Sequence, residues 1–419
     1  MKEFIKSKKG NLIVSVSLLV IAVVVTVIVG INFKSFSDYK VYFYESEAVT
    51  SKQKLSDYSK NLKGTVGDSD IYVLDSGVEG PSLLILGGTH PNEPSGQLTS
   101  VFFLENLKVH RGKVYIITEA NRSAYTHSHP QEASPYYYSI KTASGKERIF
   151  KFGSRATNTN QQWPNPDIYV HSSGQKLTSN DTRNLNRSYP GNENGTYSEK
   201  VAYGITQLIR ENDITMTIDL HEASPEYITI NALVYHQRAS ELAGRFALEM
   251  EFCDVKISTE VSPLTLHGLT HRELGDHTNT LAFLCETSNA SQGKLRGAFT
   301  EELITDGTVD KFYQKALELE QRENNDKLIY GAPTTIDERV ARHAISILSI
   351  INSYNSMSKY TDSSEYSTAI GKLEIELAGL KFYSETEEPI SAAKLRSNSR
   401  SIYDNIMENH LGTYLHDPE

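Results

Sequence analysis

The residues of this chain that could perform chemistry are two histidines and two glutamates placed where apolar stretches end. His90 and Glu93 stand three positions apart in THPNE, His221 follows MTIDL, and Glu286 follows LAFLC. Two imidazoles and one carboxylate suit a catalytic zinc ion, which keeps a fourth position for water and lowers the pKa of that water. A carboxylate outside the ligand set can take the proton and pass it to a leaving group. These residue types predict one zinc ion per chain, held by His90, Glu93 and His221, with Glu286 as the base.

Each of these motifs also has a purely structural interpretation. An H-x-x-E turn can simply bond nearby backbone, and a histidine at a strand end is commonly a polar residue of the sheet rim. Another divalent metal could occupy the same ligands. The chemical interpretation depends on a further motif, TRNLNRSYPG (182–191). There the planar guanidinium of Arg187 can hold a carboxylate through two hydrogen bonds, and the amide of Asn186 can share that anion.

These motifs must be positioned by regular elements, and the hydrophobic pattern predicts an α/β sandwich. Predicted strands lie at 70–74, 82–88, 112–121, 213–223 and 280–288, and predicted helices lie at 95–107, 198–212 and 238–252. Strands that alternate with helices favour a mixed, largely parallel sheet flanked by helices. Ligands of such sheets bind beyond the carboxyl ends of the strands, which is where the candidate residues fall. A long irregular stretch, about 125–190, is of the kind that is most often functional.

With these motifs in this order, the chain resembles the succinylglutamate desuccinylase/aspartoacylase family within the zinc carboxypeptidase superfamily. The resemblance rests on GGTHPNEPSG, NLNRSYPG, IDLHEA and LCETS, and it spans roughly residues 70–300. It implies a zinc carboxypeptidase-like fold, with the same three zinc ligands and the same glutamate as base and then acid. It also implies that Asn186 and Arg187 bind a carboxylate of the substrate.

The resemblance further implies an arginine that stabilises the oxyanion of the tetrahedral intermediate. Arg183 is the candidate, and Arg155 is the second choice. The chain departs from the family pattern in three places. Pro91 stands where the family commonly has glycine, Asn184 stands where it often has aspartate, and the insertion around 125–180 is longer than expected. These departures remove no catalytic group, but they leave the substrate open.

The segment LHGLTHRELGDHT (266–278) raises the question of a second metal site. It contains His267, His271 and His277, and positions i and i+4 share a helical face. However, no predicted strand delivers these histidines, and glycines interrupt the pattern of a helix. We therefore expect a loop beside the active site, with Arg272 reaching towards the substrate.

The N-terminal region predicts a membrane anchor. Residues 12–31 include no charged residue, and 20 helical residues at about 1.5 Å each span roughly 30 Å, the thickness of a bilayer core. Lysines precede this run, so the positive-inside rule keeps the N-terminus cytoplasmic and places the rest outside. The alternative is a cleaved signal peptide, but the run is long for one and no A-x-A-like site follows it.

The chain is accordingly divided into four predicted parts. Residues 1–33 contain the cytoplasmic N-terminus and the transmembrane helix, and 34–65 form a polar stalk. Residues 66–330 form the zinc hydrolase domain, and 331–419 form a helical C-terminal extension. A chain of 419 residues is long enough for one large domain with accessory segments.

Composition restricts the partners. The formal net charge is -10, and no Lys/Arg-dense face could neutralise phosphates, so nucleic acid is not an expected partner. Only two cysteines occur, Cys253 and Cys285, which excludes a disulfide framework and a cysteine-built zinc site. The expected partners are a small-molecule or peptide substrate with a carboxylate, and the membrane through the N-terminal helix.

The sequence therefore predicts a membrane-anchored zinc hydrolase that cleaves an amide or ester bond. A deacylase would split an N-acyl amino acid, whereas a carboxypeptidase would release the last residue of a cell-wall or extracellular peptide. The family resemblance favours the deacylase, and the outward location favours the carboxypeptidase. A catalytically inactive binding or scaffold protein is the alternative from another class. Retention of Glu286, which binding alone does not need, argues against it.

Overall fold

The computed structural model describes residues 7–128, 133–165, 168–171, 174–323, 327–357, 371–386 and 388–418. The chain divides into two compact units, Met1–Val41 and Tyr42–Glu419. The predicted boundaries at 65/66 and 330/331 both fall inside the second unit.

The central feature of the second unit is a sheet of eight strands in the described residues, in the order β1-β2-β5-β3-β10-β13-β11-β12. Strands β5, β3, β10 and β13 are parallel neighbours, β11 is antiparallel to β13, and β12 is parallel to β11. Strands β1 and β2 complete the other edge in antiparallel pairing. The predicted mixed, largely parallel sheet is thus confirmed. The strand bounds are β1 Ser51–Lys54, β2 Asp70–Asp75, β3 Ser82–Leu86, β5 Lys113–Ile117, β10 Met216–Ala223, β11 Ala232–Tyr235, β12 Ser258–Val261 and β13 Leu281–Ser288.

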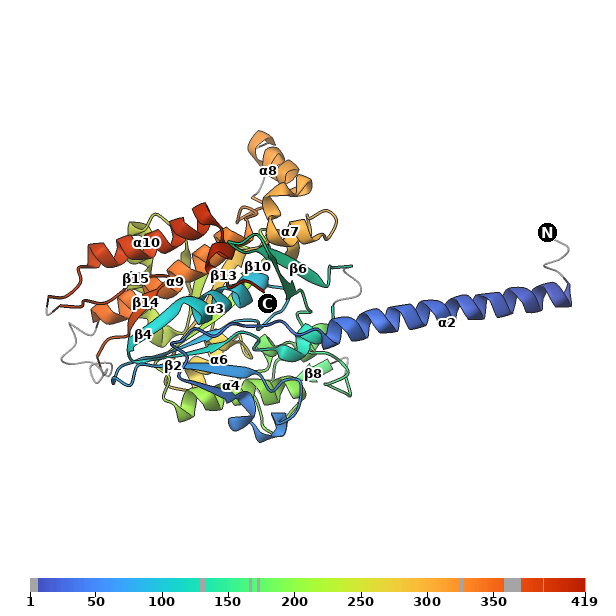
Figure 1. Cartoon of the computed structure of the whole chain (residues 1–419), viewed down its shortest axis with the longest axis horizontal. Coiled ribbons are helices and arrows are strands. Elements are labelled where there is room, and N and C mark those ends of the chain that lie inside the picture. The colour runs from blue at the N-terminus through green and yellow to red at the C-terminus, as the bar shows by residue number, and fades with distance from the viewer. Residues whose placement is uncertain are drawn as a thin grey trace. The chain divides into compact units, whose positions relative to one another are not determined.

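Helices cover both faces of this sheet (Figure 1). On one face, α3 packs on β10 and α9 packs on β13, with α5 and α10 against α9. On the other face lie α4 and α6, and the core there joins Leu84 and Leu86 of β3 to Ile205 and Ile209 of α4. The predicted layers of helices on a central sheet are confirmed. The bounds are α3 Pro94–Asn106, α4 Tyr197–Glu211, α5 Ser240–Phe252, α6 Thr270–His277, α9 Ile336–Met357 and α10 Ala392–Asn409.

Smaller elements surround the central sheet. The described parts of the stretch 125–190, predicted as irregular, contain the hairpins β6–β7 and β8–β9 and the 3-10 helices Ser179–Arg183 and Leu185–Arg187. A three-stranded sheet has the order β15-β14-β4 and joins residues from both halves of the second unit. The bounds are β4 Leu107–Arg111, β6 Tyr137–Lys141, β7 Glu147–Lys151, β8 Ile168–Val170, β9 Lys176–Thr178, α7 Glu301–Thr305, α8 Lys311–Glu323, β14 Glu374–Leu377 and β15 Leu380–Lys381.

Helix α9 is buried along almost its whole length, although its sequence contains many polar residues. Some of these polar groups are bonded inside the protein: Asn352 Nδ2 donates to Ser399 Oγ (3.1 Å), and Asn355 Nδ2 donates to the Leu373 carbonyl (2.8 Å). Others, such as Ser349 Oγ and Ser353 Oγ, are buried without a hydrogen-bond partner among the described residues. A helix predicted to belong to a C-terminal extension is therefore part of the core of the second unit. Residues 358–370 and 387 of that extension lie outside the described residues.

The expectation of a loop at 266–278 is wrong, because α6 occupies Thr270–His277. Gly275, interpreted from the sequence as a helix breaker, lies inside the helix. A Cβ at this position would lie 2.2 Å from the ring of His236, so the glycine is required by a close approach of the two elements.

The first unit contains α2, Lys8–Asp38. This helix is long and apolar enough to cross a membrane. A signal sequence near an N-terminus can also be apolar enough to meet this criterion.

Candidate metal centre

Three elements bring His90, Glu93 and His221 together. His90 lies in the turn after β3, Glu93 is the residue before α3, and His221 lies in β10, the neighbour of β3. Helix α3 comes close to β10 at Gly96, where a Cβ would lie 2.4 Å from the Leu220 carbonyl oxygen. The glycine therefore allows the start of α3 to hold Glu93 beside the strand that carries His221.

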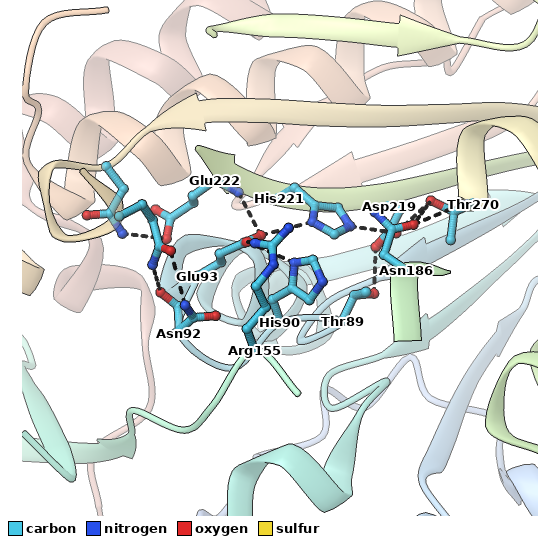
Figure 2. Close-up of polar contacts among 12 residues, drawn as sticks. Thr89, His90, Asn92, Glu93, Arg155, Asn186, Asp219, His221, Glu222 and Thr270 are labelled. Atoms are coloured by element: carbon cyan, nitrogen blue, oxygen red, sulfur yellow. Dashed lines mark hydrogen bonds and ion pairs between the residues drawn. The ribbon is translucent and has the colours of Figure 1, made fainter. Parts of the chain in front are cut away.

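The Glu93 carboxylate contacts both imidazoles (Figure 2). Its Oε1 is 2.8 Å from His90 Nδ1, and its Oε2 is 2.9 Å from His221 Nδ1. All three residues are buried, and one ligand atom from each lies within 4.8 Å of the others. In the described part of the chain, no other group of three His, Cys, Asp or Glu residues meets this spacing. The structure thus brings the three predicted ligands to one point.

The second nitrogen of each imidazole is held by an oxygen. His90 Nε2 is 2.8 Å from Asn184 Oδ1, and His221 Nε2 is 2.7 Å from Asp219 Oδ2. The Asn184 oxygen is identified independently, since it also accepts the backbone N–H of Asn186 at 2.9 Å. Both Nε2 atoms must therefore carry the proton, which leaves each Nδ1 lone pair for a metal, the usual arrangement of metal-binding histidines. Asn184, a departure from the family pattern, still supplies the acceptor oxygen.

Charges in this group suit a cation. Burial lowers the pKa of His90 to about 4, with Arg155 adding to the effect, so His90 is neutral at pH 7. Its Nδ1 lone pair then faces a carboxylate oxygen at 2.8 Å, an arrangement that is repulsive unless a positive ion lies between them. Burial also lowers the pKa of His221, but Asp219 and Glu93 outweigh it and raise the pKa to about 10. In the absence of metal a proton occupies His221 Nδ1, and a divalent cation would replace that proton. The donor set therefore fits zinc.

Glu286 lies next to this centre on β13, in register with His221 of β10. Its Oε2 atom is buried, and no described residue hydrogen-bonds to it. Burial raises the pKa of Glu286 to about 8, with Glu93 adding to the rise and His221 opposing it. A carboxyl group without a partner beside a metal site is the position that a general base requires.

Asn186, Arg187 and Glu286 line one cavity of about 510 Å³, which also reaches His221. Arg187 donates to the Asn186 carbonyl at 2.7 Å, and no carboxylate of the described residues forms an ion pair with it. The Asn186 side-chain oxygen accepts the Thr270 backbone N–H at 2.9 Å, which leaves the amide N–H groups as donors. Two donor groups without an anion at a cavity wall can bind a carboxylate.

The two candidate arginines for the oxyanion differ in position. Arg183 is buried and donates to the Thr157 carbonyl, to Asn165 and to Asn180, and it does not line the cavity. Arg155 lines the cavity and donates to Glu93 Oε1 at 2.6 Å (Figure 2). The second choice from the sequence is thus the arginine that the structure places at the metal centre.

Arg272 is the predicted substrate contact that the structure does not bring to the cavity. It is fully buried on α6 and forms two hydrogen bonds of 2.7 Å with Asp276. His267 and His277 contact the two oxygens of Glu273 at 3.0 and 3.1 Å. The ligand atoms of His267, Glu273 and His277 do not all lie within 4.8 Å of one another, as those of His90, Glu93 and His221 do. His271 does line the cavity, and burial lowers its pKa to about 3, so its imidazole is neutral.

Sequence reasoning did not identify Asp219 or Glu260 as residues of the site. Asp219 accepts from His221 Nε2, and also from Thr89 and Thr270 at 2.8 Å each. The sequence does contain a signal for Asp219. Residues two apart on a strand share a face, and in IDLH a carboxylate stands two positions before the histidine. Glu260 comes from the short exposed strand β12, which the hydrophobic pattern does not reveal.

No family model and no curated protein matches the chain. Among solved structures it is similar to a succinylglutamate desuccinylase from Silicibacter sp. TM1040, at 15% identity and a TM-score of 0.33, over 53% of each chain. It is also similar to a succinylglutamate desuccinylase/aspartoacylase from Rhodobacter sphaeroides, at 18% identity and a TM-score of 0.34, over 59% of this chain and 60% of the other. The match spans about half of the first of these proteins and three fifths of the second.

A metallo-carboxypeptidase from Burkholderia cenocepacia is a further similar structure, at 10% identity and a TM-score of 0.39, over 73% of this chain and 65% of the other. The structural neighbours thus include both the family and the wider superfamily whose motifs the sequence resembles.

Proposed function

We propose that the chain is a zinc-dependent hydrolase that cleaves an amide or ester bond in a substrate with a carboxylate, with a deacylase as the first candidate. The observation that carries this proposal is the arrangement of His90, Glu93 and His221. Two imidazole lone pairs and a carboxylate converge on one point beside the unpartnered carboxyl group of Glu286. One zinc ion per chain would complete this set.

Bound zinc would supply a water of lowered pKa and would polarise the scissile carbonyl. The chain's own residues would do the rest. Asn186 and Arg187 hold the substrate carboxylate and so fix the scissile bond in the cavity. Glu286 accepts the proton of the attacking water and returns it to the leaving atom, while Arg155 donates to the developing oxyanion. Arg183 and Arg272 have other partners and need no role in these steps.

A carboxypeptidase is the second candidate. The pair Asn186–Arg187 could hold the terminal carboxylate of a peptide as readily as the carboxylate of an acyl amino acid. The apolar helix α2 favours this candidate, since as a retained anchor with a cytoplasmic N-terminus it would place the second unit outside the membrane, among peptides. N-terminal sequencing of the chain purified from membranes tests retention, because a cleaved signal would remove residues 12–31.

The experiment uses the full chain in detergent, with metal analysis and with N-acyl amino acids and short peptides as substrates. We expect about one zinc per chain and hydrolysis that a chelator abolishes and added zinc restores. The Glu286→Gln variant should keep its zinc and lose turnover by roughly 100-fold or more. Full turnover in this variant would show that Glu286 is not the base. Zinc far below one per chain, unchanged in His90→Ala, would favour the inactive scaffold.

A further inference from the structure

The cavity beside the metal centre has an uneven set of charges. Among its described lining residues, Arg155 and Arg187 are the cationic side chains, and both have proposed tasks at the oxyanion and the substrate carboxylate. Of the acidic lining residues, Glu222 is paired inside the protein and Glu286 is the proposed base. Glu260 is the charged side chain of the lining that has no task.

Glu260 lies in one row of the sheet with two apolar residues of the cavity. Val234 of β11 is opposite Leu284 of β13 on one side and opposite Glu260 of β12 on the other. Residues opposite each other on neighbouring strands point to the same face, and all three line the cavity. Glu286, two residues after Leu284, also points to this face. The row therefore extends from β13, the strand of Glu286, over β11 to Glu260 on β12, and each step between neighbouring strands is about 4.8 Å.

The Glu260 carboxylate is oriented but not neutralised. Thr229, another lining residue, donates from Oγ1 to Glu260 Oε2 at 2.6 Å. In the described part of the chain no lysine, arginine or histidine forms an ion pair with Glu260. Charged side chains on edge strands such as β12 often serve to discourage strand pairing. That role needs a charge on the outer edge and does not explain a carboxylate at the end of an apolar cavity row.

We propose that the cavity selects a leaving group with an aliphatic side chain that ends in a cation, as in lysine or ornithine. This inference rests on the proposed function. The carboxylate of the leaving group would bind Asn186 and Arg187. The four-carbon stem of a lysine would lie along Leu284 and Val234, and its ammonium would pair with Glu260.

The same charges disfavour a leaving group with a second carboxylate. The described lining offers no third cation for it, and Glu260 would repel it at the end of the row. The inference therefore separates this chain from hydrolases whose leaving group is glutamate or aspartate.

The first test measures binding without turnover. Calorimetry on the zinc-loaded full chain in detergent compares free L-lysine with L-norleucine, which has the same four-carbon stem without the charge, and with L-glutamate. Lysine should bind roughly fivefold more tightly than norleucine, as expected for an ion pair at a partly exposed site. Glu260→Gln should remove most of this difference, and Glu260→Arg should shift the preference towards glutamate.

Glu251→Gln, at an exposed position of α5, is the matched control and should keep the wild-type ratio. Equal binding of lysine and norleucine by the wild-type chain would overturn the inference.

The second test distinguishes this inference from the proposed function. It compares kcat/KM for two sets of substrates. The first set is the N-acetyl derivatives of lysine, norleucine and glutamate, and the second is N-acetyl dipeptides that end in one of these three amino acids. Hydrolysis without a preference for lysine would overturn the selectivity and leave the hydrolase intact. Glu260-dependent binding of lysine without hydrolysis of any substrate would support the selectivity and overturn the hydrolase.

Discussion

At the residue scale, the candidate centre depends on how each imidazole is oriented. Asp219 and Asn184 hold the two Nε2 atoms, so both Nδ1 atoms face Glu93. Such outer partners set the tautomer and the basicity of a metal ligand. The roles of the two partners differ, because Asp219 brings a negative charge and Asn184 brings an amide oxygen.

We predict that Asp219→Asn weakens zinc binding by about 10- to 100-fold, because the charge behind His221 is lost while the shape of the side chain is kept. Competition with a fluorescent chelator measures the affinity. Asp276→Asn is the control, since that carboxylate pairs with Arg272 outside the cavity, and it should bind zinc like the wild-type chain. An unchanged affinity in Asp219→Asn would show that Asp219 has no part in metal binding.

Glu286 gives a second prediction at this scale, in the metal-free protein. Its pKa of about 8 in the folded chain lies above its ordinary value of 4.5, so the folded state holds this proton more tightly than the unfolded state. Ionisation of Glu286 therefore opposes folding, and the free energy of unfolding should fall as the pH rises from about 4.5 to about 8. Glu286→Gln removes this loss, so the metal-free variant should be more stable than wild type at pH 8, by up to a few kcal/mol, and similar to it at pH 4.5. Urea unfolding at both pH values, in chelator, tests this. A wild-type chain as stable as the variant at pH 8 contradicts the prediction.

At the element scale, the sequence predicted those strands and helices whose patterns are strong. Strands β3 and β13 contain apolar runs of four and five residues, LLIL and LAFLC, whereas β10, MTIDLHEA, alternates apolar with polar residues. All three strands are buried along almost their whole length because helices cover both faces of the sheet. The edge strands β1 and β12 have the sequences SKQK and STEV, which are largely exposed and have no apolar side to detect. Their places in the sheet are set by pairing with distant strands, which local pattern does not encode.

The residues of the candidate site also divide into those next to elements with a strong sequence pattern and those in stretches without one. The proximity of His90, Glu93 and His221 to one another and to Glu286 was predictable, because each of these residues ends or follows an element with a strong pattern. Arg155 and Arg183 lie in the long stretch 125–190, where no periodic pattern ranks one above the other. Only tertiary contacts show that carbonyl and amide oxygens occupy Arg183, whereas Arg155 lines the cavity.

Helix α3 yields the prediction of this scale. In Gly96→Ala the new Cβ would meet the Leu220 carbonyl oxygen, so α3 must move away from β10 and carry Glu93 with it. We expect a lower melting temperature and weaker zinc binding, measured by calorimetry and chelator competition. Gly244→Ala in α5 is the matched control, because nothing lies within 4 Å of its Cβ, and it should stabilise the chain by up to about 1 kcal/mol. If Gly96→Ala binds zinc as tightly as the wild-type chain, the packing of α3 on β10 does not determine the position of Glu93 at the candidate metal centre.

At the scale of the whole molecule, the C-terminal part of the second unit contacts the strand that carries His221 of the candidate metal centre. Glu222, the neighbour of His221, forms an ion pair of 2.7 Å with Arg339 of α9, and both side chains are completely buried. Asn289 donates to the other Glu222 oxygen at 2.9 Å. This network joins α9 to β10, the strand that carries the candidate ligand His221, so β10 is held in part by Arg339, 117 positions after Glu222 in the chain.

The last prediction follows from this ion pair. Arg339→Ala leaves the Glu222 carboxylate buried without its cation, a change that costs about 3 to 5 kcal/mol in comparable buried pairs. Because Glu222 adjoins His221, the variant should also bind zinc less tightly than wild type. The control is Arg342→Ala, three residues along the same helix, whose pair with Glu338 is partly exposed and should contribute less than about 1 kcal/mol. Urea unfolding with and without zinc measures both effects. Equal stability of the two variants would mean that α9 covers the sheet without supporting the metal strand, and the C-terminal part would then be independent of the centre.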